Sequence, residues 1–320
     1  MGEAFISVRG RVLINVEALN MTESVGNYVK HRRVPIIVPE TYTTYFVPAV
    51  SGESIAHGFQ RVLAEEASDN GVKVCKLCSK GIFLKSTNES VFKEAFGMDP
   101  PSDEFEFEKT VISNCVVEDV GGFLYAPARG GNVKRTSNFY TGYMIPVKES
   151  LKGIIIEPQM HSRYALGTKF VSREEREARG QMIYYVELSS AIYTFSLDLD
   201  TSYIGRSAFV YGRAGEVVVE DRKKRVEITL NALQKFLIEF MFGAKRTRFL
   251  PVVEWESLAI AVSDDVWTVP SPFSNNYIKR AEGKISRVNY NTNLYVYPRD
   301  GDFEEVIVRA IEDAKGRMGG

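Results

Sequence analysis

The three cysteines are the residues of this chain whose spacing points most directly to chemistry. Cys75 and Cys78 are separated by two residues, and a turn of that length can bring two thiolates to one tetrahedral zinc ion. Cys115 offers a third ligand, and the fourth would have to be a histidine, a carboxylate or a group from a neighbouring chain. Three cysteines in 320 residues are few and odd in number, which does not fit the disulfide framework of a secreted protein or a redox function. The sequence leaves two alternatives, a structural zinc ion or three buried free thiols, and no other cofactor is required.

The chain has only three histidines, and their spacing decides between acid–base chemistry and binding. A histidine can act as a general base near neutral pH, so His57 and His161 are candidates for catalysis. Neither stands in a Ser-His-Asp arrangement or at the spacing of a histidine pair, so we expect both to bind or to be structural. A loop at 129–137 has the glycines and bases of a phosphate cradle but lacks the Walker spacing. The sequence therefore predicts no enzymatic activity.

The strongest local signal is a polar and basic stretch at the end of the first predicted strand. It runs from Asn15 to Asn20 and resumes from Gly26 to Arg33. Glycine, amide, aromatic and cationic residues of this kind hydrogen-bond phosphates and 2′-hydroxyls and stack on bases. The stretch therefore predicts binding of single-stranded RNA. Its candidate residues are Asn15, Asn20, Gly26, Asn27, Tyr28, Lys30, His31, Arg32 and Arg33.

The start of a predicted helix is a second candidate phosphate site. Ser51, Gly52 and Ser54 stand where the helix begins, and the free backbone N–H groups of a first turn attract anions. A plain helix cap formed by Ser51 explains the same residues, so both interpretations stay open. One polar face of this helix carries His57, Gln60 and Arg61.

Regular elements are predicted around these residues. Apolar and polar side chains alternate along residues 5–19, which predicts a strand with two faces. One face is apolar and includes Val16, and the other is polar, open and includes Glu17. Residues 182–199 are rich in β-branched and aromatic side chains and form one long strand or two consecutive ones. Helices are expected at 51–67, at about 229–242 with Gly243 ending it, and from Asp302 to about 316, and a strand at 252–262.

In chain order these elements form the βαββαβ unit of the ferredoxin-like fold that RNA-recognition domains use. The predicted class is α+β, with one core made of residues 5–19, 51–67, 182–263 and 302–316. Large insertions are expected at about 20–50, 70–180 and 264–300.

Composition and charge exclude several classes of protein. A chain with 44% hydrophobic and 25% charged residues is neither disordered nor fibrous. Uncharged runs such as residues 41–52 are too short to span a membrane, and the N-terminus has no apolar signal region, so we expect a cytoplasmic protein. The net charge of −1 conceals segregation: residues 88–120 hold nine acids and two bases, and residues 128–180 hold ten bases and five acids. Such a chain can present a basic groove and an acidic surface on different sides.

Several motifs, taken in order, resemble one known family. The chain is similar to the DevR-type, RAMP-class backbone subunit of archaeal type I-A CRISPR interference complexes, known as Cascade. The resemblance spans nearly the whole chain and rests on the order and spacing of motifs in the first 165 residues. Besides the two stretches between Asn15 and Arg33, these motifs are Val50 to Gln60, Lys134 to Phe139, Gly142 to Pro146, and Gln159 to His161.

The resemblance implies a modified RNA-recognition core, shaped like a crescent or a hand, that forms helical filaments along CRISPR RNA and has no catalytic role. The implied partners are CRISPR RNA, target single-stranded DNA through guide pairing, further copies of the chain arranged head to tail, the RAMP-type subunit that caps the 5′ handle, and other subunits of the complex. No membrane is involved. Near-zero net charge suits a filament subunit, whose neighbours must be attracted to one another.

Carried over by position, the RNA path would be lined by the candidate residues above and by His161. We add Lys134, Arg135 and Arg163 from the basic 128–180 region. A thumb-like insertion of the family could be either that region or residues 264–290. Two other classes compete with this interpretation. One is an RNA-processing endonuclease on the same fold, with His57 or His161 as acid or base; the other, a small-ligand binding protein, would need a pocket motif that the sequence lacks.

Overall fold

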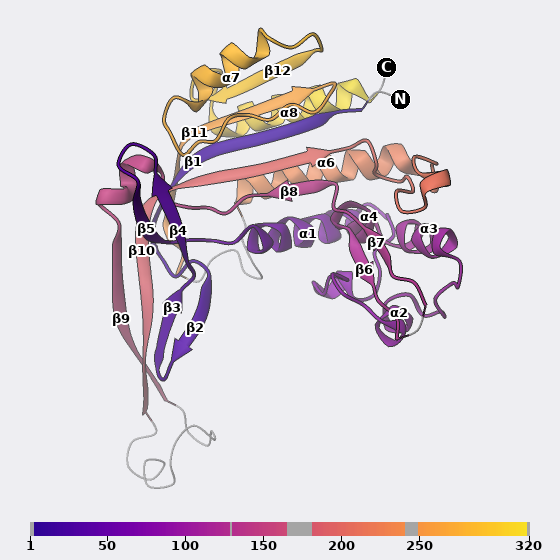
Figure 1. Cartoon of the computed structure of the whole chain (residues 1–320), viewed down its shortest axis with the longest axis horizontal. Coiled ribbons are helices and arrows are strands. Elements are labelled where there is room, and N and C mark those ends of the chain that lie inside the picture. Colours follow the sequence, from indigo (N-terminus) through magenta and orange to yellow (C-terminus); the bar gives the residue numbers. More distant parts are fainter. Residues whose placement is uncertain (1–2, 129, 165–180, 241–248, 319–320) are drawn as a thin grey trace.

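The structure, a computed structural model, describes residues 3–128, 130–164, 181–240 and 249–318 (Figure 1). It is a mixed α+β fold built on a mainly antiparallel sheet with the strand order β12-β11-β1-β10-β3-β2. Strands β8 and β9 also pair with β10. The strands of this sheet are β1 (Phe5–Glu17), β2 (Met21–Val25), β3 (Tyr28–His31), β8 (Phe139–Thr141), β9 (Ile155–Tyr164), β10 (Gln181–Asp200), β11 (Val252–Ser263) and β12 (Thr292–Tyr297).

Three long helices cover one face of the sheet and close the main core. They are α1 (Gly52–Asp69), α6 (Arg222–Glu239) and α8 (Phe303–Arg317). As predicted, Ser51 caps α1 by accepting the backbone N–H of Ser54, and Asp302 caps α8 by accepting that of Glu305. The apolar face of α1, with Ile55 and Phe59, is fully buried against the sheet. Local caps and 3.6-residue periodicity were therefore sufficient to predict these two helices.

Helix α6 begins seven residues earlier than predicted. Its first turns carry Arg222 and Arg225, which lie before the predicted start of the helix. Both arginines are buried, and their guanidinium groups donate to backbone carbonyls and to carboxylates of other segments. Gly243, the predicted helix end, lies outside the described residues, and the helix ends at Glu239.

Strand β1 follows its predicted alternation until its last residues. Ile6, Val8, Val12 and Ile14 are fully buried, but Val16 is 55% exposed and Glu17 is buried, the reverse of the prediction. Val16 has a φ of +61°, and the pairing with β10 shifts between Ile14 and Glu17. An irregularity of this kind inserts an extra residue and exchanges the faces that follow.

The predicted polar open face of β1 is not open. Ser7 and Arg11 are buried, and the segment after β11 packs over this side of the sheet. There Trp267, Val269 and Tyr277 form a second apolar cluster with Ala259 and Ala261 of β11. The Oγ of Ser7 accepts the backbone N–H of Val269 and donates to Asp198, so the polar residues of this face are used in the interior. The prediction of an open face was wrong because the sequence did not show what covers it.

Residues 182–199 belong to one strand, β10, which is 20 residues long. The partners of β10 on the side away from β1 are β8 and β9, which come from the region that the sequence analysis treated as an insertion. In Figure 1, β9 and the first half of β10 extend together beyond the end of β1 as a long ribbon. Outside residues 70–138, the other elements are β4 (Arg33–Val38), β5 (Thr43–Pro48), η2 (Lys148–Lys152), η3 (Tyr211–Arg213) and α7 (Tyr277–Ile285).

Residues 70–138 form a small helical unit beside α1. It contains η1 (Cys78–Lys80), α2 (Glu89–Phe96), α3 (Glu104–Asn114), α4 (Val116–Gly121), β6 (Phe123–Tyr125) and β7 (Val133–Arg135). A buried ion network joins it to α6: Asp119 of α4 accepts from Arg135 of β7 at 2.7 Å and from Arg225 of α6 at 3.4 Å. Within the described ranges, no helix is long and apolar enough to cross a membrane.

Candidate nucleic-acid interface

Asn20 joins three segments that the sequence analysis predicted to bind RNA. Its side-chain oxygen accepts the Nε–H of Arg32 and the backbone N–H of Ser51, each at 3.2 Å. Its carbonyl accepts the backbone N–H of Arg32 at 2.7 Å. The end of the first strand, the Gly26–Arg33 stretch and the start of α1 therefore meet at one point, which we call the Asn20 junction. Asn15 lies nearby on β1, half-buried and paired with Val252.

The Gly26–Arg33 stretch forms the tip and the second strand of the β2–β3 hairpin and ends at the first residue of β4. Gly26 has a φ of +61°, as a tight turn between Val25 and Tyr28 requires, and Asn27 binds the backbone of β10 through its side-chain nitrogen and its carbonyl. Glu187 of β10 holds the hairpin in place, since its buried carboxylate accepts from the Tyr28 hydroxyl. It also accepts the backbone N–H of His31 and a guanidinium N–H of Arg33.

The cations of this stretch differ in how freely they can reach a ligand. Arg33 pairs with Glu187 at 2.7 Å, although 43% of its side chain stays exposed. Lys30 is half-buried with its ammonium 5.7 Å from the ring centre of Tyr28. Arg32 uses only Nε, and among the described residues its two terminal nitrogens have no partner. Lys30 and Arg32 are thus the cations best placed to contact phosphates.

His31 does not fit the prediction that it lines an RNA path. Its side chain is 3% exposed, and Nδ1 lies 3.0 Å from the carbonyl oxygen of Ala18. Burial lowers the pKa of His31, so the ring is neutral at pH 7. The alternation of β3 turns this side chain inward, and its role is to pack the hairpin against the end of β1.

A cavity of about 820 Å³ opens beside the start of α1. Helix α1 contributes Gly52, Glu53, Ala56, His57 and Gln60, the loop after η1 contributes Gly81, Ile82, Phe83 and Lys85, and the β8 region contributes Ser137, Phe139, Thr141 and Tyr143. The backbone N–H groups of Gly52 and Glu53 have no hydrogen-bond partner in the described part of the chain. The helix start can therefore offer two donors and its dipole to an anion, although Ser51 also forms the ordinary cap.

The predicted polar residues of α1 differ in burial, and of them His57 and Gln60 line this cavity. The ring of His57 lies edge-on to Phe83 at 4.9 Å, and burial lowers the pKa of His57, so it carries no charge at pH 7. Gln60 is buried, and its Nε2 has no partner among the residues the structure describes. Arg61 is half-buried and lies 3.5 Å from Glu65, and Ser54 lies in the first turn. His57 and Gln60 can donate to a bound ligand as neutral groups.

The remaining predicted residues are scattered. The ring of His161 on β9 stacks between Tyr184 and Phe249, with centroids at 5.4 and 5.8 Å. Arg163 lies in β9, but its side chain is outside the described part of the structure. Lys134 is exposed on β7, which Figure 1 places well away from the β2–β3 hairpin.

Arg135 does not fit the prediction of an RNA contact. Its side chain is 1% exposed, and all five of its N–H donors are used within the chain. They bind the carboxylates of Glu108 and Asp119 and three backbone carbonyls. The sequence showed a basic pair, but the alternation of β7 exposes Lys134 and buries its neighbour.

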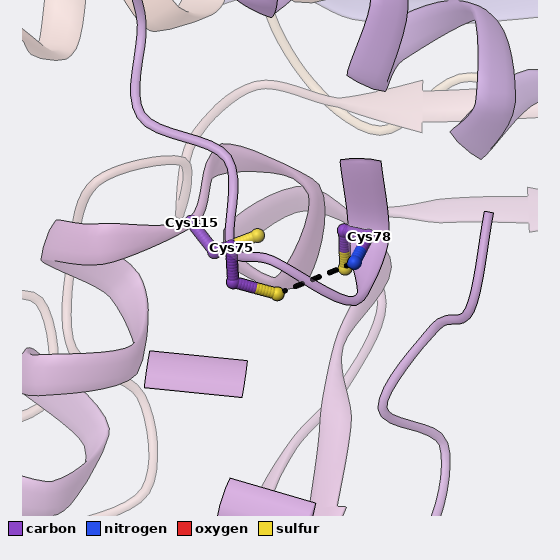
Figure 2. A group of neighbouring side chains, drawn as sticks. All are labelled: Cys75, Cys78 and Cys115. Carbon is purple, nitrogen blue, oxygen red and sulfur yellow. Dashed lines mark hydrogen bonds between the residues drawn. The ribbon is translucent and has the colours of Figure 1, made fainter. Parts of the chain in front are cut away.

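Figure 2 shows the three cysteines converging from two segments. Their sulfur atoms all lie within 4.8 Å of one another, and all three residues are buried. The backbone N–H of Cys78 donates to the sulfur of Cys75 at 3.4 Å. Hydrogen bonds from the Cys115 and Cys78 thiols hold the pKa of Cys75 well below its usual range. The spacing of the three residues in the sequence could not show that Cys115 would reach the other two.

Several residues that shape the interface were not singled out from the sequence. Glu187 was missed because a glutamate within a predicted strand gives no sign of being buried. Tyr143 lines the cavity and lies within the Gly142-to-Pro146 motif, so that motif was a usable signal. Phe83 and Lys85 follow the paired cysteines closely, but the sequence did not show that this turn packs beside α1.

Comparisons with known proteins place this chain in a class of CRISPR-associated proteins. Residues 8–282 match the family described as "CRISPR-associated negative auto-regulator DevR/Csa2". The chain belongs to this family, which confirms the resemblance found in its motifs.

The relatives are archaeal proteins. The chain is 37% identical to "CRISPR-associated protein Cas7/Csa2 1" of Saccharolobus solfataricus, over 83% of this chain and 81% of the relative. It is 36% identical to "CRISPR-associated aCascade subunit Cas7/Csa2 2" of the same organism, over 92% of each. It is also 27% identical to "CRISPR-associated protein Cas7/Cst2/DevR" of Methanocaldococcus jannaschii, over 96% of this chain and 99% of the relative.

A solved structure shares the fold at low sequence identity. A chain described as "CRISPR RNA-guided surveillance complex, pre-nicking" superposes with a TM-score of 0.52 and 11% identity, covering 97% of this chain and 100% of that one. The arrangement of the sheet and its helices is therefore one that a chain of such a complex adopts.

Proposed function

We propose that this chain is a CRISPR RNA-binding backbone subunit of an archaeal type I-A interference complex. The observation that carries the proposal is the Asn20 junction, where one amide side chain ties a basic hairpin to the start of a long helix. Cations lie on the hairpin side of this point, and on the other side α1 leads to a cavity lined by free backbone N–H groups, His57 and Gln60. These groups bind phosphate and sugar whatever the base, as a guide-binding subunit must. The family and the relatives described as Cascade subunits support the same role.

The core of the proposed subunit is ferredoxin-like. The central strands run in the order β11-β1-β10-β8, with α1 after β1 and α6 between β10 and β11. This is the strand order expected when a βαββαβ unit folds into one antiparallel sheet. Of the two candidate thumbs, residues 264–290 pack on the sheet, whereas β9 of the 128–180 region extends with the first half of β10 beyond the end of β1. The β9–β10 ribbon is therefore our choice for the segment that inserts along the guide.

In this role the chain would assemble head to tail and pair its guide with target single-stranded DNA in the cytoplasm. The subunit that caps the 5′ handle and other subunits would complete the complex. The β4–β5 hairpin exposes Ile37, Tyr42 and Phe46 by 61%, 85% and 69%. Apolar residues exposed together in this way mark a contact surface, and a neighbouring copy is the partner that the proposal supplies.

Particle mass should increase in proportion to RNA length when the chain is mixed with single-stranded RNAs. Each subunit covers a short stretch, and contacts between neighbours make loading cooperative. Light scattering on RNAs of equal composition and increasing length measures the number of copies bound. Phe46→Ser should reduce the cooperativity while leaving the binding of one subunit to a short RNA unchanged. A mass that stays at one or two copies on every RNA would contradict the filament model.

The proposal includes no catalytic step, so incubation with repeat-containing RNA should yield no cleavage products. The ring of His57 contacts Phe83, and that of His161 stacks with Tyr184 and Phe249. Among the described residues no hydrogen bond or ion pair joins either ring to a carboxylate that could orient it. Denaturing gels with end-labelled RNA, with and without divalent cations, measure cleavage. Defined cuts that disappear in His57→Ala or His161→Ala would instead support the RNA-processing endonuclease.

A further inference from the structure

A carboxylate that could serve as the fourth ligand lies beside Cys78. Glu118, in α4, is fully buried, and its Oε1 accepts the thiol of Cys78 at 2.8 Å and the backbone N–H of Leu84 at 2.9 Å. Its Oε2 is buried with no hydrogen-bond partner among the described residues. An unpartnered carboxylate oxygen in a protein interior is costly, and it calls for a cation or a donor.

We propose that Cys75, Cys78, Cys115 and Glu118 bind a structural zinc ion. Zinc bonds of about 2.3 Å to sulfur place tetrahedral thiolates about 3.8 Å apart, and the three sulfur atoms here already lie within 4.8 Å of one another. Carboxylate oxygen is an accepted fourth ligand for zinc. Small movements of side chains would therefore complete the coordination.

The turn that carries Cys75 and Cys78 has the backbone of a metal knuckle. Besides the N–H···S bond from Cys78, the N–H of Ser79 donates to the carbonyl of Cys75, and the chain leaves η1 through Gly81 at a φ of +76°. Backbone donors aimed at sulfur stabilise the thiolate that zinc requires. All four ligands are buried, so the site is closed and holds no position for a water or a substrate. This geometry favours a structural site over a catalytic one.

The zinc ion would connect two segments that otherwise meet only through packing and a few hydrogen bonds. Cys75 and Cys78 belong to the loop before the cavity residues Phe83 and Lys85, and Cys115 lies between α3 and α4. The ammonium of Lys85 donates to the carbonyl of Gly121 at 2.6 Å and can offset part of the negative charge of three thiolates and a carboxylate. The ion would therefore hold the wall of the cavity beside α1. The proposal does not depend on RNA binding.

Metal content of the full chain, measured without RNA, tests the site. Protein purified without chelators from zinc-supplemented cells should contain about one zinc ion per chain by mass spectrometry of the metal. Substitution by cobalt should give the visible bands of a tetrahedral site and the near-ultraviolet absorption of thiolate-to-cobalt charge transfer.

Glu118→Gln should keep that charge-transfer absorption but weaken zinc affinity by roughly 100-fold. Cys115→Ser should lose one thiolate's share of the absorption, and Lys80→Ala, an exposed change directly after the same turn, should alter neither the absorption nor the zinc affinity. If Cys115→Ser does not fold, the cobalt spectrum of the unaltered chain still shows whether a tetrahedral thiolate site is present. A folded, metal-free chain with three titratable thiols, or one with a Cys75–Cys78 disulfide by peptide mass, would overturn the proposal.

Discussion

Reversing the charges of Lys30 and Arg32 together, as Lys30→Glu and Arg32→Glu, should weaken binding of single-stranded RNA by roughly 100-fold. A hydrogen bond to a charged partner contributes about 1.5 kcal/mol, and two such losses amount to about two factors of ten in affinity. Lys30 lies in the β2–β3 hairpin, and Arg32 directly follows it and donates to Asn20 at the Asn20 junction. Arg33 is left unchanged because its loss would leave the buried carboxylate of Glu187 with one partner fewer.

The salt dependence of the same measurement identifies the kind of contact. If both cations neutralise phosphates, the slope of log affinity against log salt concentration should become shallower by about 1.4, since each contact on a single strand contributes about 0.7. The matched control is Lys223→Glu with Lys224→Glu, which reverses two exposed charges on α6. Fluorescence anisotropy at several salt concentrations measures both quantities. An equal loss of RNA affinity in the control variant, or an unchanged slope of log affinity against log salt concentration, would exclude the hairpin as the phosphate-binding element.

Asp119→Asn should lower the free energy of unfolding by about 3–5 kcal/mol. Asp119 is fully buried and accepts from Arg135, from Arg225 and from the backbone N–H of Gly205. The amide would remove the carboxylate that the two buried guanidinium groups share, leaving Arg135 with Glu108 and Arg225 with the partly exposed Asp221, and would place its own donors against theirs. Breaking a buried ion pair by removing one partner has a cost of this size. Urea denaturation followed by circular dichroism measures the change.

The control for this prediction uses the same arginine. Asp221 also pairs with Arg225, at 2.7 Å, but its side chain is 40% exposed. Water screens that pair, so Asp221→Asn should cost no more than about 1 kcal/mol. Equal effects of the two substitutions would mean that the network does not hold the helical unit to α6.

The elements that sequence analysis predicted well are those whose signals are local. Helices α1 and α8 have a side-chain cap and an apolar stripe within their own residues, and β11 has its own apolar run. The family resemblance was equally local, since it rested on short motifs in a fixed order. In these cases the information lies within a few residues of the position that it describes.

The candidate site was predicted less completely, because binding depends on what lies across the fold. The hairpin, the helix start and the end of β1 were each identified, but only the structure shows them joined through Asn20. Lys134 and Arg135 are neighbours of the same charge, yet one is exposed and the other is enclosed by carboxylates. A sequence shows which residues carry charge and not which of them lose contact with water.

The sequence by itself determined the class of fold, the family, the main helices and the segments that carry basic and amide residues. Tertiary structure decided which of those residues remain available to a ligand. It closed the second face of β1 with residues 264–290 and brought Glu118 and Cys115 to the paired cysteines. The physical reason is that periodicity, caps and turns arise from contacts between near neighbours. Burial and ion pairing instead depend on partners such as Asp119 and Arg225, which are far apart along the chain and meet only after folding.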